Sequence, residues 1–268
     1  APSASEVEAW LARMQGGVER VEVLLGFSNS REFQINILPG QAEYAETFSA
    51  AAFSDEVFRL YQAALDRAPD LGGFLGWAER LVQGEVKLHD AASRFIGSTE
   101  FTKVFGSLDN EEYVQQLYLN VLDRVGSVRE TSGWIERLET GALDRAGVLL
   151  GFSNSREFAR DMAGPLLDWM RDKGADDILD GGPGGDILTG GLLADTFLFV
   201  AGQGGADRVT DLERWDWISL EGFGFGDAQE ALSAMRETEE GVTFNAQGAT
   251  IEFLGKSLGD IFEDMIVV

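Results

Sequence analysis

Apolar residues recur at helical spacing along the first part of the chain. Two stretches carry them at positions i, i+3, i+4, i+7 and i+8, the pattern of a helix with one buried face. The matching residues are Val57, Leu60, Tyr61, Ala64 and Leu65 in one stretch and Val114, Leu117, Tyr118, Val121 and Leu122 in the other. After residue 165 the pattern changes to short apolar runs separated by glycine and aspartate, which is typical of strands joined by turns. The chain is therefore predicted to be multidomain, with a helical part followed by a part built of strands.

The helical part is a repeat. The segment Gly26–Phe33 recurs without change at Gly151–Phe158, and a looser copy occupies Phe95–Phe101. From one copy to the next, the tryptophan that precedes the segment and the phenylalanine that ends it advance by nearly the same amount. These landmarks are Trp10, Trp77 and Trp134 and, in the same order, Phe33, Phe101 and Phe158. Because two landmarks keep nearly the same offsets, we interpret residues 1–165 as an all-α helical repeat domain with units near 1–40, 50–107 and 108–162.

Each complete unit is expected to hold about four short helices. The last helix follows an asparagine that stands three residues before a glutamate, as Asn154 does before Glu157, and this resembles a capping box. The pairs Asp66-Arg67 and Asp123-Arg124 are expected to form salt bridges at helix ends. The first unit lacks the Leu-Tyr helix, so we expect that the chain begins inside a unit and is the C-terminal part of a longer protein.

The repeat motif, Leu-Tyr…Leu-x-Arg…Trp…Gly…Phe-x-x-Ser-x-Glu-Phe, resembles that of a bacterial helical domain of unknown function. The resemblance covers about residues 1–162. Such domains occur in secreted, cell-surface and S-layer-like proteins, and the family has no established activity. The resemblance therefore implies a fold and a setting but no reaction.

Beyond the helices, a glycine–aspartate tract repeats with a period of nine. Aspartates mark the period at Asp177, Asp186 and Asp195, and an apolar residue follows each of them by two positions. These apolar residues are Leu179, Leu188 and Phe197. The spacing predicts loops in which glycines with positive φ turn carbonyl oxygens toward a shared cation, each followed by a short strand with one inward side chain. Hard oxygen ligands favour Ca²⁺ over Zn²⁺ or Mg²⁺.

This tract resembles the RTX nonapeptide of calcium-binding β-rolls. The resemblance implies that residues 166–268 form a short calcium-bound parallel β-roll with a mixed α/β cap, and that each calcium lies between loops two repeats apart. On one side of the roll, Asp177 and Asp195 would face each other with the carbonyls of Ala175, Gly191 and Leu193. On the other side, Gly182, Gly184 and Asp186 would meet a second loop, displaced by a few inserted residues, that contains Gly202, Gly204 and Asp207. The carboxylate of Asp211 would close the set, and we expect two to four calcium ions in all.

Two residues depart from the nonapeptide pattern. Ala175 and Leu193 occupy the fourth loop position, where glycine is expected. A left-handed backbone there costs about 1–2 kcal/mol for a residue with a β-carbon. The site that includes Leu193 is therefore expected to be distorted, weaker or empty.

The tail carries further strand patterns at Arg208–Leu212, Trp217–Leu220, Gly241–Phe244 and Thr250–Leu254, and a helical pattern from Asp227 to Glu237. It resembles the cap that closes RTX rolls. The chain ends in one acidic and four apolar residues, Asp264–Val268, which resembles the uncleaved signal of type I secretion.

Composition narrows the function. A net charge of −25, from 46 acidic and 21 basic residues, disfavours nucleic-acid binding. There is no cysteine, so an exported protein of this sequence has no disulfides, and we expect bound metal to stabilise it instead. The lone histidine, His89, is interpreted as a surface residue. No apolar run suited to membrane insertion and no N-terminal secretory signal are visible in this sequence.

We therefore expect a secreted or cell-surface calcium-binding protein rather than an enzyme. Its roll would stay unfolded at cytosolic calcium, pass through the type I secretion machinery, and fold at extracellular calcium with an affinity of about 10⁻⁴–10⁻³ M. The helical repeats would mediate self-association or contact with other surface proteins, as in an adhesin or S-layer-like protein. The alternative is a non-catalytic C-terminal accessory region of a secreted enzyme or toxin whose active domain lies upstream.

Overall fold

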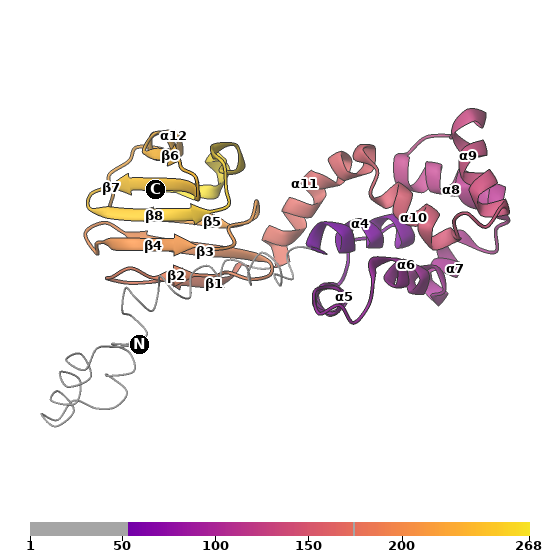
Figure 1. Ribbon diagram of the computed structural model, residues 1–268, viewed down its shortest axis with the longest axis horizontal. Helices are drawn as coiled ribbons and strands as arrows, with labels where there is room; N and C mark the ends of the chain where they lie inside the picture. The colour runs from indigo at the N-terminus through magenta and orange to yellow at the C-terminus, as the bar shows by residue number, and fades with distance from the viewer. Residues whose placement is uncertain (1–52, 174) are drawn as a thin grey trace, which may run out of the picture. The chain divides into compact units, whose positions relative to one another are not determined.

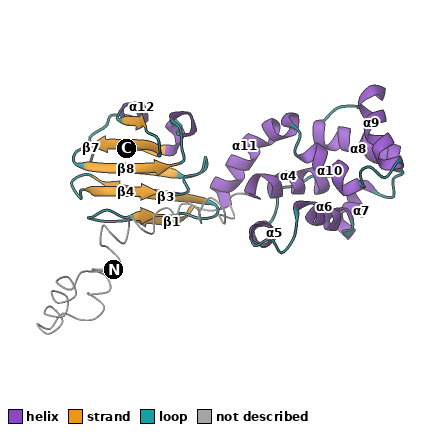
Figure 2. Ribbon diagram, viewed as in Figure 1, coloured by secondary structure: helices purple, strands orange, loops and turns teal. Residues whose placement is uncertain are grey.

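The computed structural model describes residues 53–173 and 175–268, so the first helical unit lies outside the described residues. Helices fill the first of these ranges and strands dominate the second (Figures 1 and 2). The predicted order of a helical part followed by strands is thus confirmed.

The second and third units each contain four helices, as predicted. In the second unit they are α4 (Ser54–Leu65), α5 (Leu71–Val82), α6 (Leu88–Ile96) and α7 (Thr99–Phe105). In the third they are α8 (Asn110–Leu122), α9 (Val128–Glu139), α10 (Arg145–Ser153) and α11 (Arg156–Lys173). α4 and α8 both end at an aspartate with left-handed backbone, Asp66 at φ 52° and Asp123 at φ 48°.

The two units also share one set of internal contacts. In the second unit, Tyr61 meets Phe95 edge-on, and Arg67 lies over Tyr61 and pairs with Glu100. In the third, the matching residues Tyr118, Phe152, Arg124 and Glu157 make the same contacts. The expectation of salt bridges at helix ends is met by the arginines, but their partners are these glutamates 33 residues away rather than the neighbouring aspartates.

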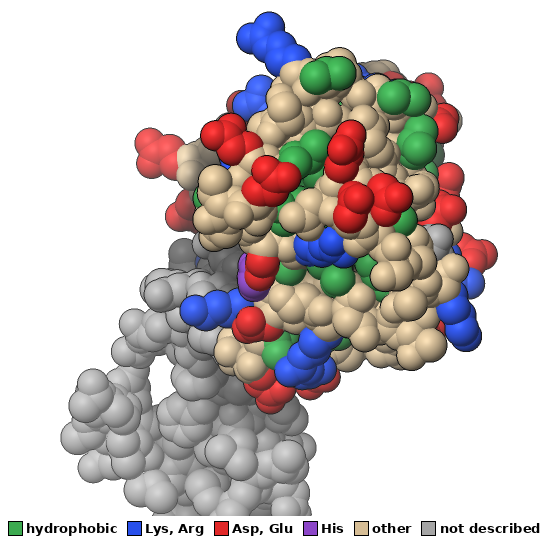
Figure 3. Space-filling model, turned by 90° about the vertical axis from the view of Figure 1, so that its right-hand side faces the viewer, with side chains coloured by type: hydrophobic (Ala, Val, Ile, Leu, Met, Phe, Trp, Pro, Cys, Tyr) green, Lys and Arg blue, Asp and Glu red, His purple; other side chains and the backbone are tan. Residues whose placement is uncertain are grey.

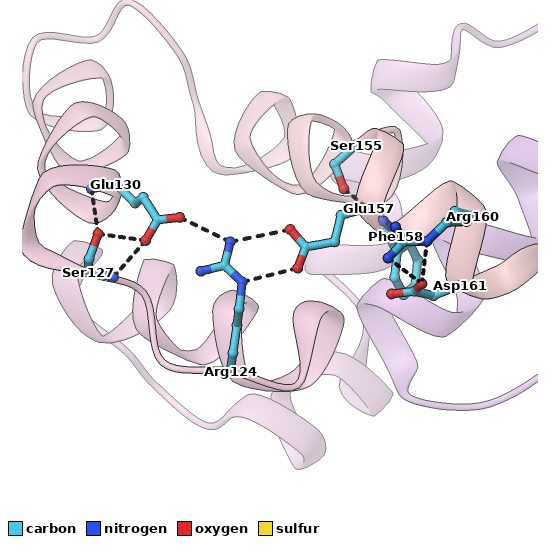
Figure 4. Close-up of polar contacts among 8 residues, drawn as sticks. All are labelled: Arg124, Ser127, Glu130, Ser155, Glu157, Phe158, Arg160 and Asp161. Carbon is cyan, nitrogen blue, oxygen red and sulfur yellow. Dashed lines mark hydrogen bonds and ion pairs between the residues drawn. The ribbon is translucent and has the colours of Figure 1, made fainter.

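The predicted capping box is wrong by one residue. Ser155, not Asn154, accepts the backbone N–H of Phe158 at 3.2 Å and so caps α11, because its short side chain is the one that faces the first turn (Figure 4). Asn154 instead ends α10 and accepts a hydrogen bond from Arg59. Glu157 is free of the cap and turns to Arg124 (Figure 4).

α11 continues through Pro165 to Lys173, so the change from helix to strand falls after the boundary that composition indicates. Proline removes one backbone hydrogen bond from a helix interior. Burial of Leu166, Trp169 and Met170 in the helical core offsets this loss, and the Trp169 indole donates to the carbonyl of Pro69 at 3.2 Å.

The strands alternate between two sheets, as half-turn repeats require. One sheet has the order β1-β3-β5-β9 and is entirely parallel; the other has the order β2-β4-β8-β7-β6, parallel from β2 to β8 and antiparallel beyond. Figure 1 shows β2, β4, β8, β7 and β6 one above another, in the order of the second sheet. The strands are β1 (Ala175–Asp180), β2 (Ile187–Leu188), β3 (Ala194–Val200), β4 (Gly205–Val209), β5 (Trp217–Glu221), β6 (Met235–Glu237), β7 (Gly241–Ala246), β8 (Ala249–Leu254) and β9 (Ile266–Val267).

Strand register reveals where the nonapeptide period holds. Leu179 of β1 pairs with Phe197 of β3, two repeat periods later, as predicted for one full turn. In the next turn, Leu188 pairs with Val209 and Phe197 with Ile218, and both separations exceed two periods. Both pairs span the loop between β3 and β4, so the predicted insertion lies in that loop.

The inward positions of the period form the core of the strand part. Leu188 and Phe197 are buried, and Leu179 packs partly buried against the same cluster. The cap lies over this core, but the helix predicted from Asp227 to Glu237 is shorter: α12 spans Ala228–Ser233, and Met235–Glu237 turns into β6. Two 3₁₀ turns, η2 (Leu258–Asp260) and η3 (Glu263–Met265), complete the cap. Within the described ranges, no helix is both long enough and apolar enough to cross a bilayer.

Candidate metal site

The loops between the strands have the backbone that the nonapeptide predicts. Gly182, Gly184 and Gly191 have φ of 73°, 138° and 99°, and Gly202 and Gly204 have φ of 85° and 67°. Leu193 also has positive φ, 75°, although its side chain is only 5% exposed. Leucine thus occupies a conformation that favours glycine, as expected for its loop position.

The first cluster of carboxylates, the Asp186 cluster, consists of Asp180, Asp186 and Asp207. The loop before Asp186 meets the loop before Asp207, as predicted: Gly184 donates to the carbonyl of Gly204 at 3.2 Å, and the Asp186 backbone N–H donates to the Asp207 carboxylate at 3.0 Å. Of the Asp186 carboxylate, Oδ2 is buried without a hydrogen-bond donor among the described residues. Burial, with the charge of Asp180, raises the pKa of Asp186, and burial with the charge of Asp186 raises the pKa of Asp207.

The second cluster, the Asp216 cluster, consists of Asp195, Asp211, Glu213 and Asp216. Asp216 is fully buried and accepts the backbone N–H of Asp195 at 3.0 Å and that of Glu213 at 2.7 Å. Asp211, 8% exposed, accepts the backbone N–H groups of Gly190 and Gly191, both at 2.8 Å. The turn from Asp211 to Asp216 therefore wraps the loop before Asp195.

Burial and charge repulsion act together in this second cluster. Burial raises the pKa of Asp216 to about 7 against the lowering effect of its two backbone donors, and the charges of Asp195 and Asp211 add to the rise. Burial, together with Asp216 and Asp211, raises the pKa of Glu213 well above its ordinary value, and Glu213 Oε2 is buried without a donor among the described residues. The positive charge of Lys256 opposes the rise in pKa at both Asp211 and Glu213.

Two of the predicted ligands do not take the predicted loop position. Ala175 is the first residue of β1 and pairs with Ala194. The register slips between Ala175 and Ile178, so Asp177 lies at the irregularity, and its side chain is exposed whereas Asp195 is buried. Asp195 instead donates its backbone N–H to the carboxylate of Asp216. The loop before Asp177 therefore supplies fewer of the predicted metal ligands than its sequence indicates.

Sequence reasoning misses three members of the clusters: Asp180, Glu213 and Asp216. Asp180 ends a strand outside the loop period, and its side chain accepts the backbone N–H of Gly182 at 2.9 Å. Asp216 carries a signal, because it follows Asp195 at the separation of 21 that also joins Asp186 to Asp207. The lengthened period, applied to both loops, would have identified it.

Both clusters offer oxygen atoms as metal ligands. Buried carboxylate oxygens and loops rich in carbonyls fit Ca²⁺, whereas Zn²⁺ prefers nitrogen and sulfur. Among residues 53–173 and 175–268, no three acidic or histidine side chains converge closely enough to hold a metal ion by themselves. Backbone carbonyls would therefore have to supply part of any coordination shell, as in the predicted loops.

Acidic residues dominate this part of the chain. From residue 175 to 268 there are 19 acidic residues against 4 basic ones. The helical face in Figure 3, by contrast, shows acidic and basic side chains intermixed. The excess negative charge of the chain is thus concentrated in the strand part.

Comparison with known families supports the helical part of this picture. A family described as a domain of unknown function (DUF4214) matches residues 1–37 and 92–162. The match covers most of the first unit, the end of the second and the third, and it agrees with the predicted resemblance to a helical domain of unknown function. No curated protein matches the chain. The RTX resemblance of the strand part stays a prediction.

Proposed function

We propose that residues 175–268 form a calcium-dependent roll that folds after export and anchors the helical repeats of a secreted or cell-surface protein. The observation that carries this proposal is the packing of like charges in the Asp186 and Asp216 clusters. Buried carboxylates without compensating cations destabilise a fold, and a bound cation removes that cost. Calcium would thus supply free energy that the apolar core alone does not.

The residues that would hold calcium are the carboxylates of the two clusters, together with carbonyls of the positive-φ loops. In the first site, the backbone N–H of Asp186 donates to the carboxylate of Asp207 across neighbouring turns. In the second, the backbone N–H of Asp195 donates to the carboxylate of Asp216, and Asp211 and Glu213 belong to the same cluster. We propose two sites in this part of the roll, the lower end of the range that the sequence predicts.

The helical units serve in this proposal as a non-enzymatic interaction scaffold. Their repeated Tyr–Phe–Arg–Glu contacts are structural, because each lies between helices of one unit. Self-association or contact with other surface proteins is the role that we propose for them. Sedimentation of the full chain in calcium at rising concentration would detect self-association directly.

Substitution of the carboxylates tests the calcium proposal. D186N/D207N and D195N/D216N each remove two charges from one cluster. In chelator, D186N/D207N should unfold at a higher temperature than the parent, because repulsion is relieved. D195N/D216N should gain less, because asparagine can accept only one of the two backbone N–H groups that the two oxygens of Asp216 accept. In 1 mM calcium, each should gain less than the parent. A site with a dissociation constant of about 10⁻⁴ M contributes roughly 1.4 kcal/mol at 1 mM ligand, or about 5–10 °C in Tm for a domain of this size.

The control is D172N, which removes an exposed carboxylate on α11 and should change neither result. Magnesium at the same concentration should stabilise much less than calcium. The proposal fails if the double variants lose stability in chelator and keep the full calcium response.

A further inference from the structure

A cavity of about 200 Å³ lies between α4, α11 and the turn that precedes β5, and none of the carboxylates of the Asp186 and Asp216 clusters is among its lining residues. Its α11 wall is apolar and includes Met162, Leu166 and Leu167. Asp55 and Arg59 of α4 and Arg214 and Trp215 of the turn close it with polar groups. The cavity is thus amphipathic.

The polar end holds hydrogen-bond donors without acceptors. Arg59 Nε, Arg214 Nη1 and Trp215 Nε1 are all buried, and none has an acceptor in the part of the chain that the structure describes. Arg59 is only 8% exposed and Trp215 only 7%. Buried N–H groups nearly always have a hydrogen-bond acceptor in folded proteins. Three such groups without an acceptor, all on residues that line one cavity, therefore point to a ligand that would accept from them.

The local charge also favours an anion. Arg59 pairs with Asp55 at 3.0 Å, and Arg171 and Arg214 share Asp264 at 2.8 and 2.9 Å. The charged residues that line the cavity itself are Arg59, Arg214 and Asp55, and the carboxylates of Asp55 and Asp264 are both about half exposed. The excess of one positive charge is unusual in a chain of net charge −25.

We propose that this cavity binds a small carboxylate with a short aliphatic tail. The carboxylate would accept from the guanidinium and indole N–H groups after a small rotation of Arg214, and the tail would lie on Met162, Leu166 and Leu167. A cavity of about 150 Å³ holds a six-carbon ring, so the volume here suits a ligand of roughly six to eight heavy atoms. A cation is disfavoured because the unpartnered buried atoms are all donors and Asp55 is already paired with Arg59. An inorganic anion would leave the apolar wall uncovered.

The residues proposed to contact this ligand differ from those proposed to hold calcium, and sodium hexanoate is the probe that tests the proposal. Isothermal titration of the full chain in calcium should show saturable binding of sodium hexanoate. Hexanol, which has the same tail without the charge, should bind at least about tenfold more weakly, the usual worth of a hydrogen bond to a charged group. Hexylammonium should not bind at all. Added salt should leave the affinity for hexanoate unchanged or raise it, because it screens the negative charge of the whole chain.

Variants distinguish this cavity from other surfaces. W215F keeps an aromatic ring, though a smaller one, and removes the indole N–H. R214K keeps a cation for Asp264 but removes the planar donor set. Each should weaken hexanoate binding about fivefold or more, and A159L, which fills the cavity from α11, should abolish it. R160K, an exposed arginine on the same helix, is the matched control and should bind as the parent does. Equal binding of hexanoate and hexanol, or parental affinity in W215F, R214K and A159L, would overturn the proposal.

Discussion

Two effects on stability oppose each other at Leu193: backbone strain and side-chain burial. Its φ of 75° costs about 1–2 kcal/mol relative to glycine, whereas its buried side chain contributes about 1.5–3 kcal/mol of apolar burial. Burial wins, which explains why leucine can stand at a loop position that favours glycine. Leu193 also belongs to the helical core cluster, as Trp215 does, so this side chain links the loop to the helices.

Substitutions at Leu193 should therefore reverse the usual order. L193A keeps the backbone strain and loses most of the burial, so we expect a loss of about 2–3 kcal/mol. L193G loses slightly more burial but relieves the strain, and we expect it to be about 1 kcal/mol less destabilising than L193A. Chemical unfolding in saturating calcium measures both. A glycine variant less stable than the alanine variant would show that the left-handed backbone costs little here.

Gly205 tests the contact between neighbouring loops. A β-carbon at Gly205 would overlap the carbonyl oxygen of Gly184, whereas one at Gly182 would meet open space. Both glycines have positive φ, 130° at Gly205 and 73° at Gly182, but only Gly205 adds the overlap with Gly184 to the backbone penalty. G205A should therefore abolish calcium binding at the Asp186 cluster, and G182A should only weaken folding by about 1 kcal/mol. Similar calcium titrations for the two variants would contradict the loop contact.

At the scale of elements, the turn from Asp211 to Asp216 connects the strand part to the helices. It holds the Asp216 cluster, and between its acidic residues Trp215 packs into the helical core. Arg171 of α11 donates to the carbonyl of Trp215 at 3.3 Å and to Asp264 at 2.8 Å. A cation that orders this turn would therefore also order the contact of the strand part with α11.

The same turn predicts an unusual pH dependence. The pKa of Asp216 is raised to about 7 and that of Glu213 is raised too, mainly by burial. A carboxyl group with a raised folded pKa binds more protons when folded, so stability rises as pH falls through that pKa. In chelator, the strand part should therefore become more stable from pH 8 to pH 5.

Thermal unfolding followed by circular dichroism in chelator, at several pH values, measures this trend. In saturating calcium the trend should disappear or reverse, because protons then compete with the cation. D195N/D216N is the matched variant and should flatten the trend in chelator. A parent whose stability in chelator falls steadily from pH 8 to pH 5 would contradict it.

Elements are predictable from the sequence where the period is strict and much less so where tertiary contacts decide. The nonapeptide period predicts β1 to β3 and the inward side chains Leu188 and Phe197, because each half-turn needs one apolar residue at the same position. It fails for Asp216, since the insertion between β3 and β4 lengthens the following turn. The motif alone predicts Asn154 as the cap of α11. It cannot show that Arg59, 95 residues away, donates a hydrogen bond to the Asn154 side chain. Pro165 suggests a boundary, but packing of Trp169 carries the helix past it.

On the scale of the whole molecule, charge and core are divided between two parts. The helical units have a large core, to which Leu193, Ala194 and Trp215 of the strand part also belong, and mixed surface charges. The strand part joins a smaller apolar core to most of the excess negative charge. Calcium should therefore govern the folding of the strands much more than that of the helices.

Hydrogen exchange of the full chain, in chelator and in 1 mM calcium, measures this difference most directly. The backbone N–H groups of Asp186, Gly190, Gly191 and Asp195 donate to carboxylates of the two clusters, so they report on the loops themselves. We predict that these amides and those of β2 to β5 exchange rapidly in chelator and become protected in calcium, while α4, α6, α8 and α10 stay protected in both. Equal protection of β2 to β5 with and without calcium would contradict a calcium-dependent roll.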